Sequence, residues 1–268
     1  MIQPLFGEKK LLIGMIHLLP LPGSPNYKGE DINRIIQHGQ EDLSALLEGG
    51  INVALIENFG DVPYTRRKIP RQTLVAMSIA AREIIKSGGS SLQAFGTNVL
   101  RNDWESSISI AASLGATFAR LNVLTGAFVT DQGLIQGDAF NCLNFRKQVY
   151  PDLKIFADVF VKHASPLGLD PERDLEVTVK DTVYRGLADA VIVSGTRTGI
   201  APDIERLKRV REAIPETPVL IGSGLTAGNA PDLLQFADGA IVGTSLKTDG
   251  KVDVNKVKEL VRVLSKIG

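Results

Sequence analysis

Two short apolar runs near the carboxyl end of the chain finish in glycine and small hydroxyl residues, at 222–224 (GSG) and 243–245 (GTS). Glycine lets a backbone approach an anion closely, and Ser and Thr hydroxyls can donate further hydrogen bonds to it. If the runs are neighbouring parallel strands, their ends form one phosphate site, and a short helix expected over 229–236 directs its positive end at the anion. Simple tight turns are the alternative. The predicted phosphate-binding residues are Gly222, Ser223, Gly224, Gly243, Thr244 and Ser245.

Ionisable side chains follow other apolar runs. His17 ends the run LLIGMIH, Glu57 closes NVALIE, and Asp158 and Lys162 lie in KIFADVFVK. Such groups exchange protons with a substrate, so we expect Asp158 or Glu57 to be the general base and His17 or Lys162 its acid partner. Lys162 could instead form a Schiff base if it is desolvated, or a salt bridge.

Amide, guanidinium and hydroxyl groups lie at the ends of further apolar runs, where they could orient hydroxyl or carbonyl groups of a ligand. Strand alternation predicts that Arg120 and Asn122 share one face of their strand. It also predicts that Asp158 and Lys162 share one face of the next strand with Phe156 and Phe160. A charge in mid-strand is costly beneath packed helices unless it is paired, which favours the interior mouth of a barrel. A structural layer of ion pairs inside the barrel is the alternative. The predicted substrate-binding residues are Asn98, Arg101, Arg120, Asn122, Ser194 and Thr196.

A metal site has weaker support in the sequence. His17, Glu57 and Asp158 could together hold a divalent metal, because carboxylate and imidazole groups suit several such ions. No H-x-x-x-H or C-x-x-C spacing accompanies them. We therefore predict neither a metal nor another cofactor.

These residues must be positioned by a repeating architecture. Apolar β-type runs alternate with segments of helical periodicity over the whole chain, without a break in composition. Strands separated by helices imply parallel pairing, and eight such units predict a closed (β/α)8 barrel as one domain over residues 1–268. An open doubly wound sheet is the alternative, but the first strand–helix turn lacks G-x-G-x-x-G. The predicted strands are 11–17, 52–58, 92–98, 117–123, 154–162, 189–195, 218–224 and 239–245.

Composition limits the partners and the compartment. The chain has 268 residues, and its 30 Lys and Arg residues balance 30 Asp and Glu residues, so charge gives no case for a nucleic-acid partner. Its single cysteine excludes an internal disulfide and fits a reducing compartment. The first residues lack the pattern of a signal peptide, and no run is long enough to span a bilayer. We expect a cytoplasmic protein without membrane insertion, which leaves open peripheral membrane association through a partner.

Three segments are longer than turns require, at 18–30, 59–71 and 124–137. Long structured loops at the carboxyl ends of strands often act as lids or as contacts between subunits. The segment 59–71 carries Tyr64 and a basic run at 66–68, which could close over a phosphorylated ligand. We expect either a lid or a homo-oligomer interface.

The strings at the strand ends resemble those of the BtpA family over nearly the whole chain. They include GMIHLLPLPGSP, ALIENFGDVPY, ARLNVLTGAFVTDQGLIQG, IFADVFVKHA and ADGAIVGTSLK. Proteins of this family are associated with photosystem I biogenesis in cyanobacteria, and similar sequences include SgcQ-like proteins of sugar-metabolism operons. The family is grouped with ribulose-phosphate-binding barrels. The resemblance thus implies a barrel of that type, and agrees with an anion site.

Two functions follow from these features. The first is an enzyme acting on a small phosphorylated metabolite, a sugar or nucleoside phosphate, as an isomerase, lyase or hydrolase. The second, which the resemblance implies, is a non-catalytic assembly or stability factor for a membrane complex such as photosystem I. A phosphorylated ligand should stabilise the enzyme against heat. An assembly factor should expose an apolar patch and show no such response.

Overall fold

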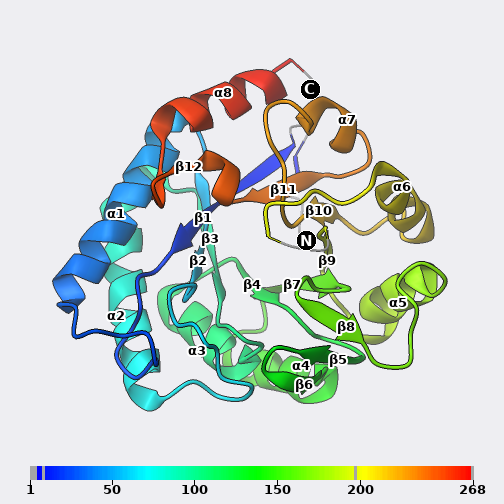
Figure 1. Cartoon of the computed structure of the whole chain (residues 1–268), viewed down its shortest axis with the longest axis horizontal. Helices are drawn as coiled ribbons and strands as arrows, with labels where there is room; N and C mark the ends of the chain where they lie inside the picture. Colours follow the sequence, from blue (N-terminus) through cyan, green and yellow to red (C-terminus); the bar gives the residue numbers. More distant parts are fainter. Residues whose placement is uncertain (1–4, 8–9, 196–197, 267–268) are drawn as a thin grey trace.

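A closed ring of eight parallel strands forms the centre of the molecule, in the order β1-β11-β10-β9-β7-β4-β3-β2 (Figure 1). The computed structural model describes residues 5–7, 10–195 and 198–266. The ring confirms the predicted (β/α)8 barrel and excludes the open sheet. Its strands are β1 (Leu11–His17), β2 (Val53–Glu57), β3 (Ala94–Asn98), β4 (Phe118–Leu121), β7 (Lys154–Val159), β9 (Ala190–Val193), β10 (Val219–Ile221) and β11 (Gly239–Val242).

Alternation along the strands fills the barrel with apolar side chains and places polar ones at its carboxyl end. In β7, Phe156 lies inside the barrel and stacks on Phe118 with ring centroids 4.6 Å apart. Asp158 follows two residues later on the same face. Phe160 does not share that face, contrary to the sequence expectation. The strand ends at Val159 and Phe160 takes a φ of 50°, so its ring packs among the outer residues against Phe128.

Helices surround the ring on all sides (Figure 1). Aspartates cap several of their amino termini; Asp31, for example, accepts a hydrogen bond from the backbone of Asn33 at the start of the first helix. That helix ends at Gly50, whose φ of 98° suits glycine. The helices are α1 (Ile32–Gly49), α2 (Arg71–Gly88), α3 (Trp104–Leu114), α4 (Ala139–Val149), α5 (Leu175–Lys180), α6 (Ile204–Ala213), α7 (Ala230–Leu233) and α8 (Val254–Leu264), with short turns η1 (Gly89–Ser91), η2 (Asp181–Arg185) and η3 (Thr244–Leu246). None of the described helices combines the length and apolar character needed to cross a membrane.

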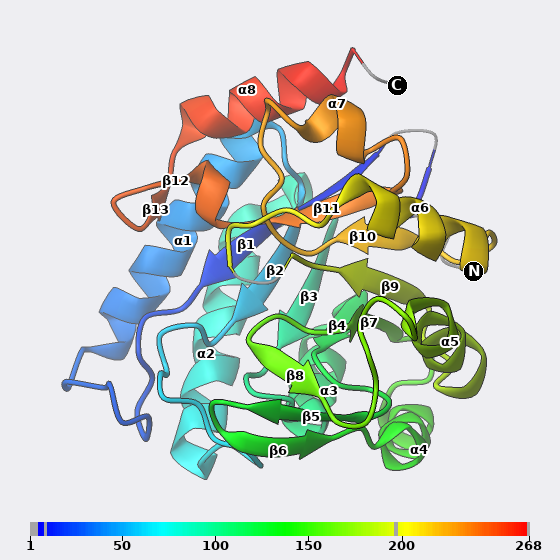
Figure 2. The same ribbon diagram turned by 45° about the vertical axis from the view of Figure 1, so that its right-hand side comes forward.

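The segment 124–137 is a β-hairpin rather than an irregular loop. Its strands β5 (Ala127–Thr130) and β6 (Gly133–Gln136) pair antiparallel, and β8 (Ala164–Pro166) adds a third strand next to β5. This small sheet lies below β4 and β7 in Figure 2. Phe128 and Ile135 pair on its buried face, which joins the sheet to the core. A second short ribbon consists of β12 (Lys247–Thr248) and β13 (Lys251–Val252).

Candidate functional site

The polar layer at the carboxyl end of the barrel is set by strand register. His17 on β1 lies opposite Glu57 on β2, and Glu57 lies opposite Asn98 on β3. Each of these residues continues the inward-facing row of its strand, above apolar residues such as Met15 and Leu55. These three side chains, which lie up to 81 residues apart in sequence, therefore meet at the carboxyl edge of the barrel.

Asp158 is held by a buried bidentate ion pair. Arg120 donates from Nε to Oδ2 (3.0 Å) and from Nη2 to Oδ1 (2.9 Å), and Asn122 donates to Oδ2 (2.9 Å). The Arg120 and Asp158 side chains are only 3% and 1% exposed. Both carboxylate oxygens are engaged, so this pair matches the structural ion-pair layer considered above more closely than a free general base. A catalytic role for Asp158 stays a prediction.

Glu57 has a more open environment on the other side of the barrel. Its Oε2 accepts a hydrogen bond from Asn98 at 2.6 Å, and its Oε1 lies 3.9 Å from His17 Nε2. Burial, followed by the charges of Lys247 and Lys162, lowers the pKa of His17 to about 3. The imidazole is therefore neutral near pH 7, where it can accept a proton or donate a hydrogen bond but is no strong acid. The Phe59 ring stacks on it, with centroids 4.3 Å apart.

Lys162 follows β7 and lines the same cavity as Glu57 and Arg120. Its backbone carbonyl accepts a hydrogen bond from Arg101 Nη2 at 2.7 Å, which anchors this segment. Burial, and then the charge of Arg120, lowers the pKa of the Lys162 amine, although Glu57 and Asp158 oppose the shift.

The two glycine-rich ends lie beside each other, but their serine hydroxyls are occupied. Ser223 donates to the carbonyl of Ile200 (2.9 Å), and Ser245 donates to that of Leu225 (2.6 Å), so both tie neighbouring loops together. The expectation that these hydroxyls donate to an anion is not supported by this geometry.

Backbone amides are the donors that remain at these ends. The N–H groups of Ser223 and Gly224 have no hydrogen-bond acceptor among the described residues, and the same holds for Thr244 and Ser245. All four residues line the cavity. Gly224 has a φ of 75°, and a Cβ placed there would lie 2.1 Å from the backbone N of Ala201, so this end requires glycine.

The short helix after β10 has a structural task. It has four residues, Ala230–Leu233, instead of the predicted 229–236. Asn229 accepts from the backbone of Thr226 and donates to the carbonyl of Gly224, so it closes the loop on itself. A helix of one turn has little dipole to offer an anion.

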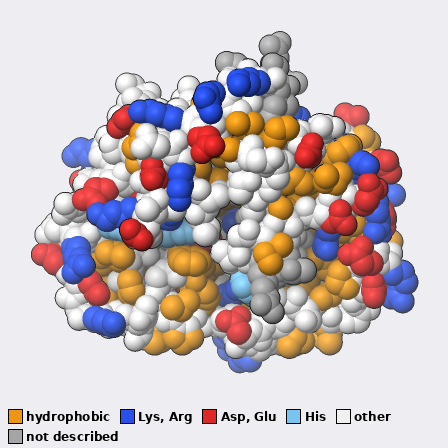
Figure 3. Space-filling model, turned by 45° about the horizontal axis from the view of Figure 1, so that its top comes forward, with side chains coloured by type: hydrophobic (Ala, Val, Ile, Leu, Met, Phe, Trp, Pro, Cys, Tyr) orange, Lys and Arg blue, Asp and Glu red, His pale blue; other side chains and the backbone are white. Residues whose placement is uncertain are grey.

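One cavity of about 260 Å³ joins these parts. Gly243 connects them closely, since a Cβ added there would lie 3.3 Å from His17 Cε1. Figure 3 shows pale-blue histidine side chains beside hollows of one face, with Lys or Arg and Asp or Glu intermixed around them. The described lining residues are Met15, His17, Glu57, Phe59, Arg120, Lys162, Thr198, Gly199, Gly222, Ser223, Gly224, Thr226, Ile241, Val242, Gly243, Thr244 and Ser245.

The predicted substrate-binding residues divide into lining and supporting groups. Arg120 lines the cavity. Asn98 donates a hydrogen bond to Glu57, and Asn122 donates one to Asp158, so these amides support the carboxylates. The buried Ser194 hydroxyl has no hydrogen-bond partner within the described part of the chain, and its oxygen would lie 2.4 Å from a Cβ added at Gly222. Arg101 anchors the Lys162 segment, and Thr196 lies outside the described residues.

Sequence reasoning missed some of the lining. Phe59 belongs to one of the long segments, and only its position two residues after Glu57 could have indicated it. Met15 was also missed; it lies two residues before His17 on the same strand face. As for metals, no group of three or more His, Cys, Asp or Glu side chains suited to an ion is found in the described part of the chain.

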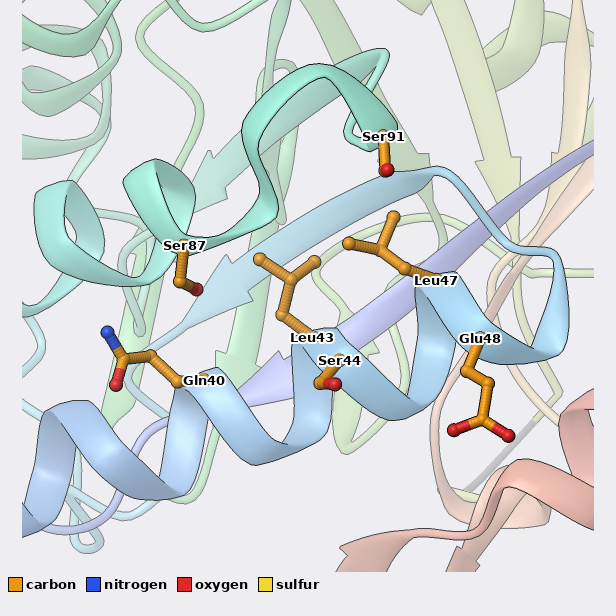
Figure 4. A pocket seen from close by; sticks show the side chains of 7 residues that line it. All are labelled: Gln40, Leu43, Ser44, Leu47, Glu48, Ser87 and Ser91. Carbon is orange, nitrogen blue, oxygen red and sulfur yellow. The ribbon is translucent and has the colours of Figure 1, made fainter.

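A larger hollow of about 640 Å³ lies elsewhere, between α1 and the end of α2 (Figure 4). Leu43 and Leu47 face across it towards Ser87 and Ser91, and Glu48 is the one ionisable side chain among its described lining residues. It lies towards the amino-terminal ends of β2 and β3, away from the polar strand ends. Chemistry requires converging ionisable groups, so the cavity at the barrel mouth is the candidate site.

Comparisons with known proteins agree with the fold. The sequence model of the BtpA family matches residues 8–266. The photosystem I biogenesis protein BtpA of Synechocystis is 40% identical over 258 residues, covering 96% of this chain and 87% of the relative. The putative sgc region protein SgcQ of Escherichia coli is 32% identical, covering 93% of this chain and 90% of its own length.

Solved structures with little sequence identity share the barrel. A thiamine phosphate pyrophosphorylase from Pyrococcus furiosus superposes with a TM-score of 0.60 at 15% identity, covering 96% of both chains. A 3-hexulose-6-phosphate synthase from Salmonella typhimurium gives 0.59 at 12% identity, covering 96% of this chain and 99% of its own. At such identity the likeness concerns the fold alone.

Proposed function

The chain belongs to the BtpA family, and on that premise we propose that it is an enzyme acting on a small phosphorylated metabolite at the carboxyl-end mouth of its barrel. The substrate class is a sugar or nucleoside phosphate. Several barrels that share the fold have names that contain phosphorylated compounds, which is consistent with this class but does not identify a substrate. The reaction is a proton-transfer reaction such as isomerisation or C–O or C–N cleavage.

The observation that carries the proposal is the shared cavity. It brings two glycine-rich strand ends with unused backbone N–H groups next to Lys162, Arg120 and Glu57. Backbone N–H groups and fixed cations favour an anion, and ionisable groups beside it can act on the rest of the ligand. Packing of the barrel alone would not require the glycine-rich strand ends and the ionisable side chains to lie together.

Charge also favours an anionic ligand. Three buried or half-buried cations, Arg101, Arg120 and Lys162, accompany two carboxylates, Glu57 and Asp158. Arg120 and Asp158 neutralise each other through their bidentate pair. A phosphate group would balance the remaining positive charge, which is costly to bury alone.

Among the predicted acid–base groups, Glu57 suits the role of general base best. It lines the cavity, and Asn98 occupies only one of its oxygens by hydrogen bonding. Asp158 would serve as the anchor that fixes Arg120. Lys162 is the cationic partner, and neutral His17 supplies a hydrogen bond to a substrate hydroxyl or carbonyl.

A thermal-shift titration tests the phosphate site. The probes are inorganic phosphate and ribose 5-phosphate, with ribose as the control ligand. A ligand present at 100 times its Kd adds about 2.7 kcal/mol to the free energy of unfolding. For a chain of this length, that raises Tm by roughly 5 °C. Ribose should give no shift.

Two matched variants locate the response. Thr244→Glu adds a negative charge to an exposed lining residue and should abolish the shift, since it repels the phosphate. Ser90→Glu adds the same charge on an exposed turn at the other end of the barrel and should leave the shift intact. Equal responses in both variants, or no response of the parent protein to either phosphate, would reject the proposed site.

One observation favours assembly as a second candidate function. The outer face of the small sheet exposes apolar side chains: Val129 is 48% exposed, its cross-strand partner Leu134 40%, and the nearby Leu167 57%. Exposed apolar patches often mark sites of protein contact. If phosphate probes fail and replacing Val129 and Leu134 with Ser abolishes binding to a membrane-complex partner, this function replaces the first.

A further inference from the structure

Lys162 lies in the cavity without a close counter-ion. Among the described residues, no carboxylate oxygen lies within 4.0 Å of its Nζ, whereas Lys247, which is also largely buried, is paired with Asp42 at 2.8 Å. The reason is visible in the surroundings. Arg120 and Asn122 take both oxygens of Asp158, the carboxylate on the same strand as the lysine segment.

The surroundings also make the Lys162 ammonium easier to deprotonate. Burial is the largest influence and the charge of Arg120 the next, and both lower the pKa of Lys162. A lysine ammonium is strongly hydrated, so removal from water shifts it towards the amine, which is the nucleophilic form. A structural lysine would more commonly be held in an ion pair, as Lys247 is.

We propose that Lys162 forms a Schiff base with the carbonyl carbon of a phosphorylated aldehyde or ketone, whose phosphate is held by the glycine-rich ends of the same cavity. This inference rests on the proposed function and specifies its substrate class as a carbonyl compound. The backbone contact from Arg101 fixes the segment that carries the amine, and Glu57, at the end of β2, lines the same cavity.

The step balances with groups already in the cavity. The Lys162 ammonium gives a proton to Glu57, and the free amine adds to the carbonyl carbon. One proton of the amine passes to the carbonyl oxygen, which gives a neutral carbinolamine. Glu57 then returns the proton to the carbinolamine hydroxyl, which leaves as water. The products are an iminium ion on Nζ and one water molecule, and Glu57 is again a carboxylate. The positive iminium then withdraws electrons from the adjacent carbon, which eases loss of a proton or bond cleavage there.

Pyridoxal 5′-phosphate is a suitable probe, because it joins an aldehyde to a phosphate. The full-length protein is incubated with it, reduced with borohydride and digested, and the modified lysines are found by mass spectrometry. Pyridoxal, which lacks the phosphate, is the matched probe. We expect Lys162 to be labelled about ten-fold more by the phosphorylated probe, since binding of the phosphate orients the aldehyde. Excess inorganic phosphate should suppress the labelling, and Lys247 should stay unmodified.

Lys162→Arg tests which lysine carries the adduct. The variant cannot form an imine at position 162, so the adduct at this position should disappear while the labelling of exposed lysines stays unchanged. If the parent protein responds to phosphate but is labelled only on exposed lysines, the Schiff base is rejected and the phosphate site stands. If neither labelling nor a thermal response occurs, both are rejected.

Discussion

Asp158→Asn tests whether this carboxylate is an anchor rather than a base. The substitution keeps the side-chain shape but removes the charge and turns one acceptor into an amide donor. In the parent protein, the two Asp158 oxygens accept three hydrogen bonds, two from Arg120 and one from Asn122. After the change, the new amide NH2 group points at hydrogen-bond donors of Arg120 or Asn122. The Arg120 guanidinium, which is 3% exposed, then has no counter-ion in the pair.

The expected loss of stability is large. Breaking a buried ion pair by removing one partner costs about 3–5 kcal/mol, because the other charge stays buried. An unfolding entropy of about 2.1 cal/mol/K per residue converts each kcal/mol into roughly 2 °C for a chain of this length. Tm should therefore fall by roughly 5–9 °C. Urea unfolding at neutral pH, followed by circular dichroism, measures the free energy directly.

Asp181→Asn is the matched control. Asp181 forms an ion pair with Arg185 on one helix surface at 3.7 Å, and both side chains are more than half exposed. Its loss should change stability by less than about 0.5 kcal/mol. If Asp158→Asn costs no more than this control, then the bidentate pair is not an anchor, and Asp158 becomes available again as the predicted general base.

Three further outcomes follow from local geometry and charge. The pKa of His17 is about 3 in the folded protein and 6.5 in the unfolded chain, so the unfolded chain takes up a proton first as the pH falls. The free energy of unfolding should therefore decrease below pH 6.5, by about 2 kcal/mol between pH 7 and 5. His17→Asn should remove this part of the pH dependence measured by urea titration. Gly224→Ala should cost more than Gly115→Ala by denaturant unfolding, since both have positive φ but only the first meets a backbone, at Ala201; equal costs would contradict the close approach. The Cys142 thiol is fully buried and its pKa is raised to about 12 by that burial; it should react with a thiol reagent only after unfolding, and fast labelling of the native protein would contradict its packing.

The barrel could be predicted because each of its strands is a short apolar run followed by a helical segment. The small antiparallel sheet could not, although a signal was present. Residues 127–136 contain two short runs with β-prone residues, AFVT and LIQ, on either side of a turn that ends in Gly133, whose φ of 93° fits a hairpin. The third strand has only three residues, Ala164–Pro166, and a strand so short has no periodicity of its own.

The sequence could predict which side chains gather at the site, but not which of them pair with one another. Alternation correctly put Arg120, Asp158 and Glu57 at the mouth, because each continues an inward row. It could not tell that Asp158 is taken by a partner 38 residues away while Glu57 keeps an oxygen open. Likewise, the residue types at the strand ends predicted that the Ser223 and Ser245 hydroxyls donate hydrogen bonds to an anion. The structure instead uses those hydroxyls between loops and leaves the backbone amides unused.

The pairing of Arg120 with Asp158 links the stability of the barrel to the chemistry of its mouth. If Asp158 were free, its charge would draw the Lys162 ammonium into an ion pair and hold it protonated. Because Arg120 occupies that carboxylate, burial and then the charge of Arg120 lower the pKa of Lys162 more than Glu57 and Asp158 raise it. Among the described residues that line the cavity, Glu57 is then the carboxylate that can exchange a proton with the amine. A buried ion pair of this kind contributes little net stability compared with apolar packing, so its physical consequence lies in how it leaves Lys162 in the same cavity as the glycine-rich strand ends.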